Sequence, residues 1–202
     1  MGRRGLSEAG SQCYNPGLMA LICPWWLTLT FDNPLRRLVH EPRTMLGPYV
    51  EPGMRVADLG CGMGHFTLGL AELVGPSGHV QAVDLQPEQL ARAGRRLERA
   101  GLDARVTLTQ AEPGDLRLEG NLDFVLAFWM VHEVPDAGGF FAQIRDHLAT
   151  DGRLLVAEPR MHVKPADLAQ SLETARYAGL RAREIPPRIR LSRTALLERA
   201  EG

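Results

Sequence analysis

Apolar runs of strand length alternate with segments of helical period over most of the chain from residue 54 onward. Runs that predict strands lie at 54–60, 79–85, 104–110, 122–130 and 152–159. Segments that predict helices lie between or after them, at 65–74, 87–101, 136–149 and 165–179. Strands separated by helices of about 10–15 residues form right-handed βαβ units. The alternation therefore predicts an α/β fold with a doubly wound, mainly parallel sheet.

Two last strand-like segments, around residues 181–190 and at 192–199, follow one another without a helix between them. This spacing predicts a C-terminal antiparallel hairpin that completes a seven-stranded sheet. Pro186 and Pro187 fall inside the first segment and have no N–H to donate to a ladder. We therefore expect them at a bulge or at the edge of the sheet.

The composition is that of an ordinary globular chain, and it excludes some classes of function. The 202 residues suffice for one domain, and the net charge of −1 gives no general electrostatic reason to bind nucleic acid. Lys164 is the sole lysine, which leaves one candidate for Schiff-base chemistry. Cys13, Cys23 and Cys61 are too few and too scattered for a disulfide framework or a zinc site. We expect a cytoplasmic protein without a metal.

The N-terminal stretch contains two arginines followed by an apolar run, LMALICPWWLTL, at residues 18–29. The run is too short to span a bilayer, contains Pro24, and lacks a small-residue cleavage site. We therefore expect no membrane anchor. Residues 1–30 are predicted to form a partly ordered N-terminal extension that leads into a covering segment. Residues 31–202 are predicted to form a single domain.

A glycine-rich loop, DLGCGMGH, runs from Asp58 to His65 directly after the first predicted strand. The dinucleotide fingerprint GxGxxG requires a glycine where His65 stands, and no GK[ST] follows for a phosphate-binding P-loop. The Asp58 carboxylate at the end of the strand would repel a pyrophosphate and attract an ammonium group. The loop thus favours a cationic ligand and disfavours a nicotinamide dehydrogenase. The alternative is that Asp58 only caps the following helix.

A second acid, Asp84, ends the next predicted strand, where a carboxylate can accept hydrogen bonds from both hydroxyls of a ribose. Leu85 beside it can lie against a purine face. An acid that attracts an amine, a bare loop, an acid that binds ribose and an apolar wall match the parts of S-adenosylmethionine. The alternative is that Asp84 starts the helix that begins near Pro87.

Four motifs in order, VADLGCGMGHFTLGLA, VDLQPEQL, LDFVLAFWMVHEV and GRLLVAEP, resemble those of class I S-adenosylmethionine-dependent methyltransferases. The small single-domain members related to quinone-biosynthesis methyltransferases are the most similar, and the resemblance covers about residues 31–200. It implies a Rossmann-like fold, S-adenosylmethionine as cofactor and S-adenosylhomocysteine as product.

The resemblance also implies roles for particular residues. The loop would surround the methionine half of the cofactor, with the residues Asp58, Leu59, Gly60, Cys61, Gly62 and Gly64. Asp84 and Leu85 would contact the ribose and the base. Ala111 and Glu112 are similar to the family's adenine-contacting segment, although aspartate is usual there. Phe128 would flank the methionine and the transferable methyl group.

His132, just after the fourth predicted strand, is the candidate general base, and its ordinary titration near pH 6.5 suits a phenol, enol or thiol acceptor. The alternative is a packing role at the strand end. Glu133 follows it, but a zinc motif HExxH would need a histidine in place of Asp136. Glu158 is a second acid that would face the pocket. His65 is expected to be a bystander, and Cys61 is not expected to act as a nucleophile.

The acceptor pocket is predicted to be covered by aromatic side chains from the segment that precedes the fold. The candidates are Trp25, Trp26, Phe31 and Tyr49, with Trp129 facing them; the alternative for each is plain packing. An anionic acceptor could meet arginines, for which a solvated surface is the simpler interpretation. These arginines are Arg36, Arg37, Arg181, Arg183, Arg188, Arg190 and Arg193.

The sequence thus predicts in-line methyl transfer to a small-molecule acceptor, with neither nucleic acid nor membrane as a partner. Two alternatives stay open. One is an RNA or protein methyltransferase, against which the near-neutral charge argues. The other is a module that binds the cofactor without turnover. The sequence carries no signal for a particular oligomeric state.

Overall fold

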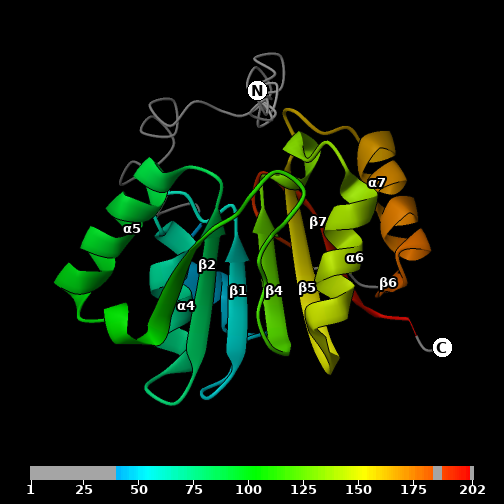
Figure 1. The fold of residues 1–202 in the computed structure, drawn as a ribbon. Coiled ribbons are helices and arrows are strands. Elements are labelled where there is room, and N and C mark those ends of the chain that lie inside the picture. Colours follow the sequence, from blue (N-terminus) through cyan, green and yellow to red (C-terminus); the bar gives the residue numbers. More distant parts are fainter. Residues whose placement is uncertain (1–39, 184–187, 201–202) are drawn as a thin grey trace, which may run out of the picture.

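A seven-stranded sheet with helices on both faces forms the computed structural model, which describes residues 40–183 and 188–200 (Figure 1). The strands are β1 (Arg55–Leu59), β2 (His79–Asp84), β3 (Val106–Gln110), β4 (Leu122–Phe128), β5 (Leu148–Pro159), β6 (Leu180–Ala182) and β7 (Ser192–Arg199). The helices are α3 (Pro42–Leu46), α4 (His65–Val74), α5 (Pro87–Ala100), α6 (Ala137–His147) and α7 (Pro165–Tyr177), with short 3-10 turns η2 (Asp103–Arg105) and η3 (Val131–Glu133).

The strand order is β3-β2-β1-β4-β5-β7-β6, and the strands β1 to β5 run parallel to one another. The chain winds outward from β1 to β3 and then returns to place β4 on the other side of β1. Strand β7 lies between β5 and β6 and is antiparallel to both. The predicted mainly parallel sheet with a C-terminal antiparallel pair is therefore confirmed.

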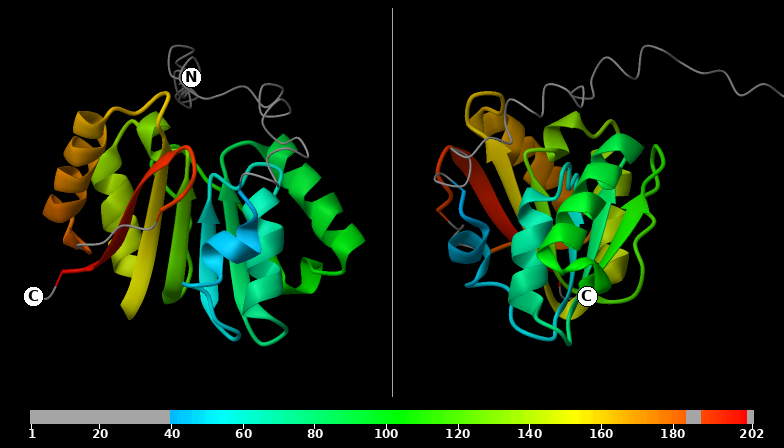
Figure 2. Two further views of the ribbon diagram at one scale, coloured as in Figure 1. Left: turned by 180° about the vertical axis from the view of Figure 1, so that it is seen from behind. Right: turned by 90° about the vertical axis from the view of Figure 1, so that its left-hand side faces the viewer.

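Two apolar clusters fill the two faces of the sheet. On one face, Phe66 and Leu70 of α4 pack with Leu46 of α3 against the central strands. Figure 2, which turns the molecule to its back, shows α3 and α4 in front of the sheet. On the other face, Phe141 and Ile144 of α6 pack against the same strands. Because both faces are covered, the central strands are near-continuously apolar, as the sequence shows for β4.

Helix boundaries follow local signals in the sequence. Pro87 occupies the first turn of α5, and Gly101 ends it with a left-handed φ of 65° and an N–H bonded to the Glu98 carbonyl. Asp136 precedes α6, and its carboxylate accepts a hydrogen bond from the Gly139 N–H at 2.9 Å. These helices were predicted within about two residues because their caps lie in the sequence itself.

Three elements differ from the sequence-based expectation. Helix α3 was not predicted; it starts at a proline, and the Glu41 carboxylate accepts a hydrogen bond from the Thr44 N–H at 2.7 Å. Strand β6 covers only Leu180–Ala182, so the strand expected at 181–190 was placed wrongly. Residues 184–187, which include both prolines of that segment, lie outside the described residues.

Strand β5 begins at Leu148, four residues before the expected start at Gly152. Its pairing with β4 shifts register between Leu122 and Phe124. A Cβ on Gly152 would lie 2.6 Å from the Leu122 carbonyl oxygen, so only glycine allows the two backbones to approach here. The glycine that looked like a strand boundary is a close contact inside the strand.

The expectations for the N-terminal extension, residues 1–30, fall outside the described residues. Within residues 40–183 and 188–200, no helix is both long enough and apolar enough to cross a membrane.

Gly69 in the middle of α4 provides a test of the contact between α3 and α4. A Cβ there would lie 2.3 Å from the Pro42 Cβ, so Gly69→Ala should lower the free energy of unfolding by about 1–3 kcal/mol in urea denaturation. Gly94→Ala in α5 is the control, because its Cβ would meet only the end of the Leu108 side chain at 3.2 Å. That variant should be neutral or stabilised by up to about 1 kcal/mol. Equal losses in both variants would contradict the packing.

Candidate active site

The candidate site lies where the carboxyl ends of β1, β2, β4 and β5 meet at one edge of the sheet (Figure 1). Strands β1 and β4 are neighbours, and the chain leaves them toward opposite faces through α4 and α6. Ligands of doubly wound sheets bind at such a topological switch point. The sequence-predicted site residues Asp58, Asp84, Phe128 and Glu158 all occupy one of the last two positions of their strands at this edge.

The glycine loop between β1 and α4 uses three left-handed residues. Gly60, Gly62 and Gly64 have φ values of 66°, 53° and 78°. A Cβ on Gly60 would lie 3.2 Å from Met130, and one on Gly64 would lie 3.1 Å from Ala93. A Cβ on Gly62 would meet nothing within 4 Å. Gly60 and Gly64 thus serve close packing, whereas Gly62 presents open backbone at the edge of the sheet.

Asp58, at the end of β1, is buried and accepts a hydrogen bond from the Thr67 hydroxyl at 2.6 Å. The N-cap residue of α4 is Gly64, which makes no side-chain capping hydrogen bond. Asp58 is thus not the N-cap residue of α4, and it contacts that helix through the side chain of Thr67. Its carboxylate lies beneath the glycine loop instead, between β1 and the first turn of α4.

The Asp84 carboxylate connects the loop to the end of β2. Its Oδ2 accepts a hydrogen bond from the Gly62 N–H at 2.9 Å, and its Oδ1 accepts one from the Gln86 N–H at 2.9 Å. Burial raises the pKa of this carboxyl group above its ordinary value, and these N–H donors oppose the shift. An ionised carboxylate has about four acceptor positions, so both oxygens can also accept from a ligand hydroxyl.

The segment after β3 lies beside Asp84. The Ala111 N–H donates to the Asp84 carbonyl at 3.0 Å, which places the buried Ala111 next to the loop. The side chain of Leu85 is 39% exposed at the same edge. The Glu112 side chain instead pairs with Arg117, in a turn closed by backbone hydrogen bonds between Glu112 and Asp115. Ala111 and Leu85 thus form an apolar edge, and Glu112 points into a surface ion pair.

An aromatic pair follows β4. The rings of Phe128 and Trp129 lie 5.2 Å apart at 22°, and the edge of the His40 ring approaches them at 5.1 and 5.3 Å. Trp129 has a φ of 57°, which is uncommon for a residue other than glycine. Its N–H donates to the Ala157 carbonyl at 2.7 Å, and its indole N–H donates to the Ser192 hydroxyl at 2.9 Å. Strands β5 and β7 therefore fix this aromatic wall.

His132, on η3, pairs with Glu158 at the end of β5. The Nδ1 atom of His132 contacts Glu158 Oε2, while Glu158 Oε1 accepts the Val131 N–H at 2.8 Å. The Nε2 atom lies 3.8 Å from Glu133 Oε1, and the side chain of His132 is 27% exposed. The hydrogen bond that His132 donates to the Glu158 carboxylate raises the pKa of His132, burial opposes this rise, and the charges of Glu158 and Glu133 add to it.

Cys61 and His65, which the sequence also singled out, are both buried. The Cys61 thiol is buried, and burial together with the charges of Asp58 and Asp84 raises its pKa well above the ordinary value, which disfavours a nucleophilic thiolate. The His65 ring bonds to the His40 carbonyl at 2.9 Å, which agrees with a bystander role.

Tyr49 stacks on Phe124 at 6.1 Å, in the amino half of β4. This contact agrees with the alternative that Tyr49 is a packing residue. Tyr49 does not cover the carboxyl ends of the strands. Trp25, Trp26, Phe31, Arg36 and Arg37 lie outside the described residues.

Three of the C-terminal arginines make side-chain contacts within the protein. Arg181 and Arg183 approach Glu198 at 2.8 and 3.7 Å, and Arg193 donates to the Val163 carbonyl at 2.8 Å. These contacts favour the surface interpretation over an anion-binding one. Among residues 40–183 and 188–200, no group of three or more His, Cys, Asp or Glu could hold a metal ion.

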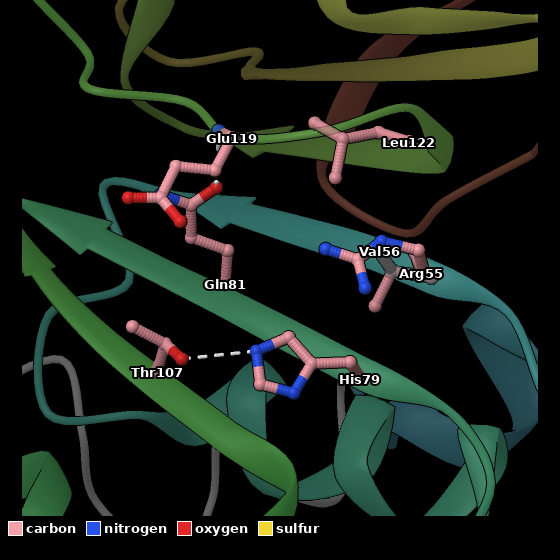
Figure 3. Close-up of a pocket in the computed structure, with 7 residues that line it drawn as sticks. All are labelled: Arg55, Val56, His79, Gln81, Thr107, Glu119 and Leu122. Atoms are coloured by element: carbon pink, nitrogen blue, oxygen red, sulfur yellow. Dashed lines mark hydrogen bonds between the residues drawn. The ribbon is translucent and has the colours of Figure 1, made fainter.

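Two hollows lie away from this edge. The first, between the amino ends of β1, β2 and β4, is lined by Arg55, His79 and Thr107, with the His79 ring bonded to the Thr107 hydroxyl at 3.0 Å (Figure 3). Its volume of about 20 Å³ suits about one water molecule. The second, about 260 Å³, lies between α3 and α4 beside Arg43 and Glu72. Neither contains the strand ends described above.

Met130, Thr67 and Ser192 were not predicted as site residues. Met130 and Thr67 lie within the quoted motifs, but apolar and hydroxyl side chains there carry no distinctive pattern. Ser192 is far from Trp129 in sequence, so only the pairing of β5 with β7 brings them together.

A parallel sheet wound outward from β1, with an antiparallel strand inserted before its last strand, is the class I methyltransferase type of Rossmann-like fold. A family model described as a methyltransferase domain matches residues 50–189. This match covers more than half of the chain. The chain belongs to the methyltransferase domain family that its motifs resemble.

The alignments with curated relatives cover only part of each relative's length. The chain is 31% identical over 163 residues to trans-aconitate 2-methyltransferase of Mycobacterium tuberculosis, covering 80% of this chain and 58% of the relative. It is 30% identical over 117 residues to demethylmenaquinone methyltransferase of Lactobacillus johnsonii, covering 57% and 48%. The chain thus spans about half the length of the curated relatives it matches.

Among solved structures, an S-adenosylmethionine-dependent methyltransferase from Aquifex aeolicus has a TM-score of 0.76 at 21% identity. The match covers 87% of this chain and 98% of that one. At this level of identity the likeness confirms the fold.

The pair of His132 and Glu158 should couple stability to pH. Since the pKa of folded His132 is raised, its contribution to stability is present below about pH 6.5 and disappears as pH rises through the folded-state pKa. Relative to the wild type, Glu158→Gln should therefore lose more stability at pH 5.5 than at pH 9 in urea denaturation. Glu133→Gln removes a charge 3.8 Å from Nε2 of His132 and should show a smaller difference. A pH-independent effect of Glu158→Gln would contradict the coupling.

Proposed function

We propose that this chain catalyses S-adenosylmethionine-dependent methyl transfer to a small molecule. The observation that carries the proposal is the hydrogen bond between the Gly62 N–H and the Asp84 carboxylate. It places an open loop backbone and a carboxylate with remaining acceptor capacity side by side at the switch point. This arrangement suits the ribose and amino-acid parts of the proposed cofactor.

The residues present fit that cofactor. Gly62 leaves the space that a Cβ would occupy, and nothing lies within 4 Å of it. Asp84 would hold the ribose hydroxyls, Leu85 and Ala111 would lie along the base, and Asp58 beneath the loop would favour the ammonium group. Phe128 would flank the methionine half, and the loop residues Leu59, Gly60, Cys61 and Gly64 would complete its surroundings. Glu112 would contact the base only after leaving Arg117.

S-adenosylmethionine, when bound, supplies a methyl group that is already activated by its sulfonium. The contribution of the chain is therefore mainly to align an acceptor and exclude water, and alignment alone can supply up to about 7–11 kcal/mol of the barrier. The fixed rings of Phe128 and Trp129 are suited to limit water at the site. His132 is our candidate to accept a proton from the acceptor.

A small acceptor is favoured by the net charge of −1, which offers no field for a polyanion. The relatives named above are a trans-aconitate and a demethylmenaquinone methyltransferase, both named for small acceptors. We also propose that residues 31–202 form one domain of a cytoplasmic enzyme, without a membrane or nucleic-acid partner.

Gly62 and Gly101 provide a matched pair to test the cofactor site. Both have left-handed φ, 53° and 65°, and neither would place a Cβ within 4 Å of another atom. Alanine should therefore cost each a similar backbone strain of about 1–2 kcal/mol. Gly62→Ala should weaken S-adenosylhomocysteine binding at least tenfold in calorimetry, because its Cβ fills the cradle, whereas Gly101→Ala at the end of α5 should not change it. Equal S-adenosylhomocysteine affinities of the Gly62→Ala and Gly101→Ala variants would contradict the proposed cofactor site.

Asp84→Asn tests the ribose contact by the same measurement. The amide keeps one acceptor oxygen but loses the charge, so affinity for S-adenosylhomocysteine should fall about tenfold or more, as for a hydrogen bond to a charged group. Methyl transfer itself is tested with methyl-labelled S-adenosylmethionine and a metabolite extract. Label on small molecules supports the proposal, whereas label confined to RNA or protein, or binding without any product, contradicts it.

A further inference from the structure

We propose that Glu158 is a positioning residue that holds His132 as the proton acceptor for a neutral methyl acceptor carrying an ionisable hydrogen, such as a phenol, an enol or a thiol. The inference rests on the methyl-transfer function proposed above and extends it by a second residue and an acceptor class. It starts from the buried carboxylate of Glu158, whose side chain is 3% exposed.

Both carboxylate oxygens of Glu158 make hydrogen-bond contacts. Oε1 accepts the Val131 N–H at 2.8 Å, and Oε2 contacts Nδ1 of His132. An ionised carboxylate can only accept hydrogen bonds, so Nδ1 must carry the proton of this contact. In the neutral ring the lone pair then resides on Nε2. Glu158 therefore selects the tautomer in which Nε2, and not Nδ1, can take up a proton.

The residue that precedes η3 lies against the glycine loop. Met130, two residues before His132, lies so close to Gly60 that a Cβ there would be 3.2 Å from its side chain. The His132 side chain is partly exposed, and Nε2 lies 3.8 Å from Glu133, beyond hydrogen-bond distance. Nε2 of His132, the nitrogen that can accept a proton, thus lies near the carboxyl ends of β4 and β5. Glu133 is too far from it for a hydrogen bond.

The need for a base indicates the acceptor class. Glu158 on β5 and Glu133 on η3 face His132, and the His162 ring lies 6.2 Å away. A carboxylate acceptor is already ionised at neutral pH, so it has no proton for His132 to accept. An acceptor that is protonated at neutral pH gains from a base.

The proposed transfer conserves atoms and charge. The lone pair of the acceptor atom X forms the X–C bond to the methyl group as the C–S bond breaks, and the bonding pair stays on sulfur. The proton of X passes to Nε2 of His132, so the positive charge lost by the sulfonium appears on the imidazolium beside Glu158. Loss of that proton to water restores His132. Proton transfer of this kind contributes about 10²–10⁴-fold in enzymes.

Glu158→Gln is the discriminating variant. The glutamine oxygen can still accept the Val131 N–H, while its amide can donate to Nδ1 and so reverse the tautomer. ¹⁵N NMR of the histidine rings in the full chain should find the wild-type His132 protonated on Nδ1, and the variant protonated on Nε2 with a lower pKa. Glu133→Gln should keep the wild-type tautomer. The same tautomer and pKa in wild type and Glu158→Gln would overturn the proposal.

The kinetic test uses S-adenosylmethionine with 4-methylphenol, 4-methylthiophenol and 4-methylbenzoate as matched probes. We expect transfer to the phenol or thiol at least tenfold faster than to the benzoate. Glu158→Gln should lower kcat about 100-fold and move the rising limb of the pH profile to lower pH, with KM and S-adenosylhomocysteine affinity within about twofold.

The outcomes separate the two proposals. Failure of the wild type to bind S-adenosylhomocysteine would refute the proposed function itself. Binding with faster transfer to the benzoate, or with no transfer to any probe, would refute the acceptor class. An unchanged kcat and pH profile in Glu158→Gln would refute the positioning role, and Glu158→Asp, which keeps the charge, should recover part of the wild-type rate.

Discussion

The hydrogen bond from the Gly62 N–H to the Asp84 carboxylate joins the loop after β1 to the end of the neighbouring strand β2. Each partner depends on the other: the left-handed loop directs its N–H toward β2, and the half-buried carboxylate would lose a donor without it. A backbone hydrogen bond from the Cys61 N–H to the Val83 carbonyl at 3.0 Å ties the same loop to β2. The proposed binding edge is therefore held by contacts between neighbouring parts of the sheet.

The opposite side of the edge depends on side chains that cross between strands. Trp129 keeps its unusual backbone conformation through hydrogen bonds to β5 and β7, and Glu158 ties η3 to the end of β5. The antiparallel strand β7 thus contributes to the aromatic wall through Ser192, which the sequence did not single out. In the proposed function, β1 to β3 form the cofactor side, and β4, β5 and β7 form the acceptor side.

Local signals predicted most of the fold. Pro87 and Gly101 bracket α5 as expected, and the apolar run of β4 agrees with its burial on both faces. One kind of error arises where a residue is compatible with two structural roles. Gly152 looked like the start of a strand, but it is a close contact between β5 and β4. Helix α3 was missed because its five residues are too few to show a period.

For the site, the sequence alone determined which residues lie close to the strand ends, because chain order and alternation dictate which ends share an edge. It thereby identified Asp58, Asp84, His132 and Glu158 as candidates. Only the tertiary structure decided how they pair: Asp58 with Thr67, Asp84 with Gly62, and His132 with Glu158. The physical reason is that hydrogen bonds require contact within about 3 Å. The register of strands far apart in the chain sets those distances, and no local pattern encodes them.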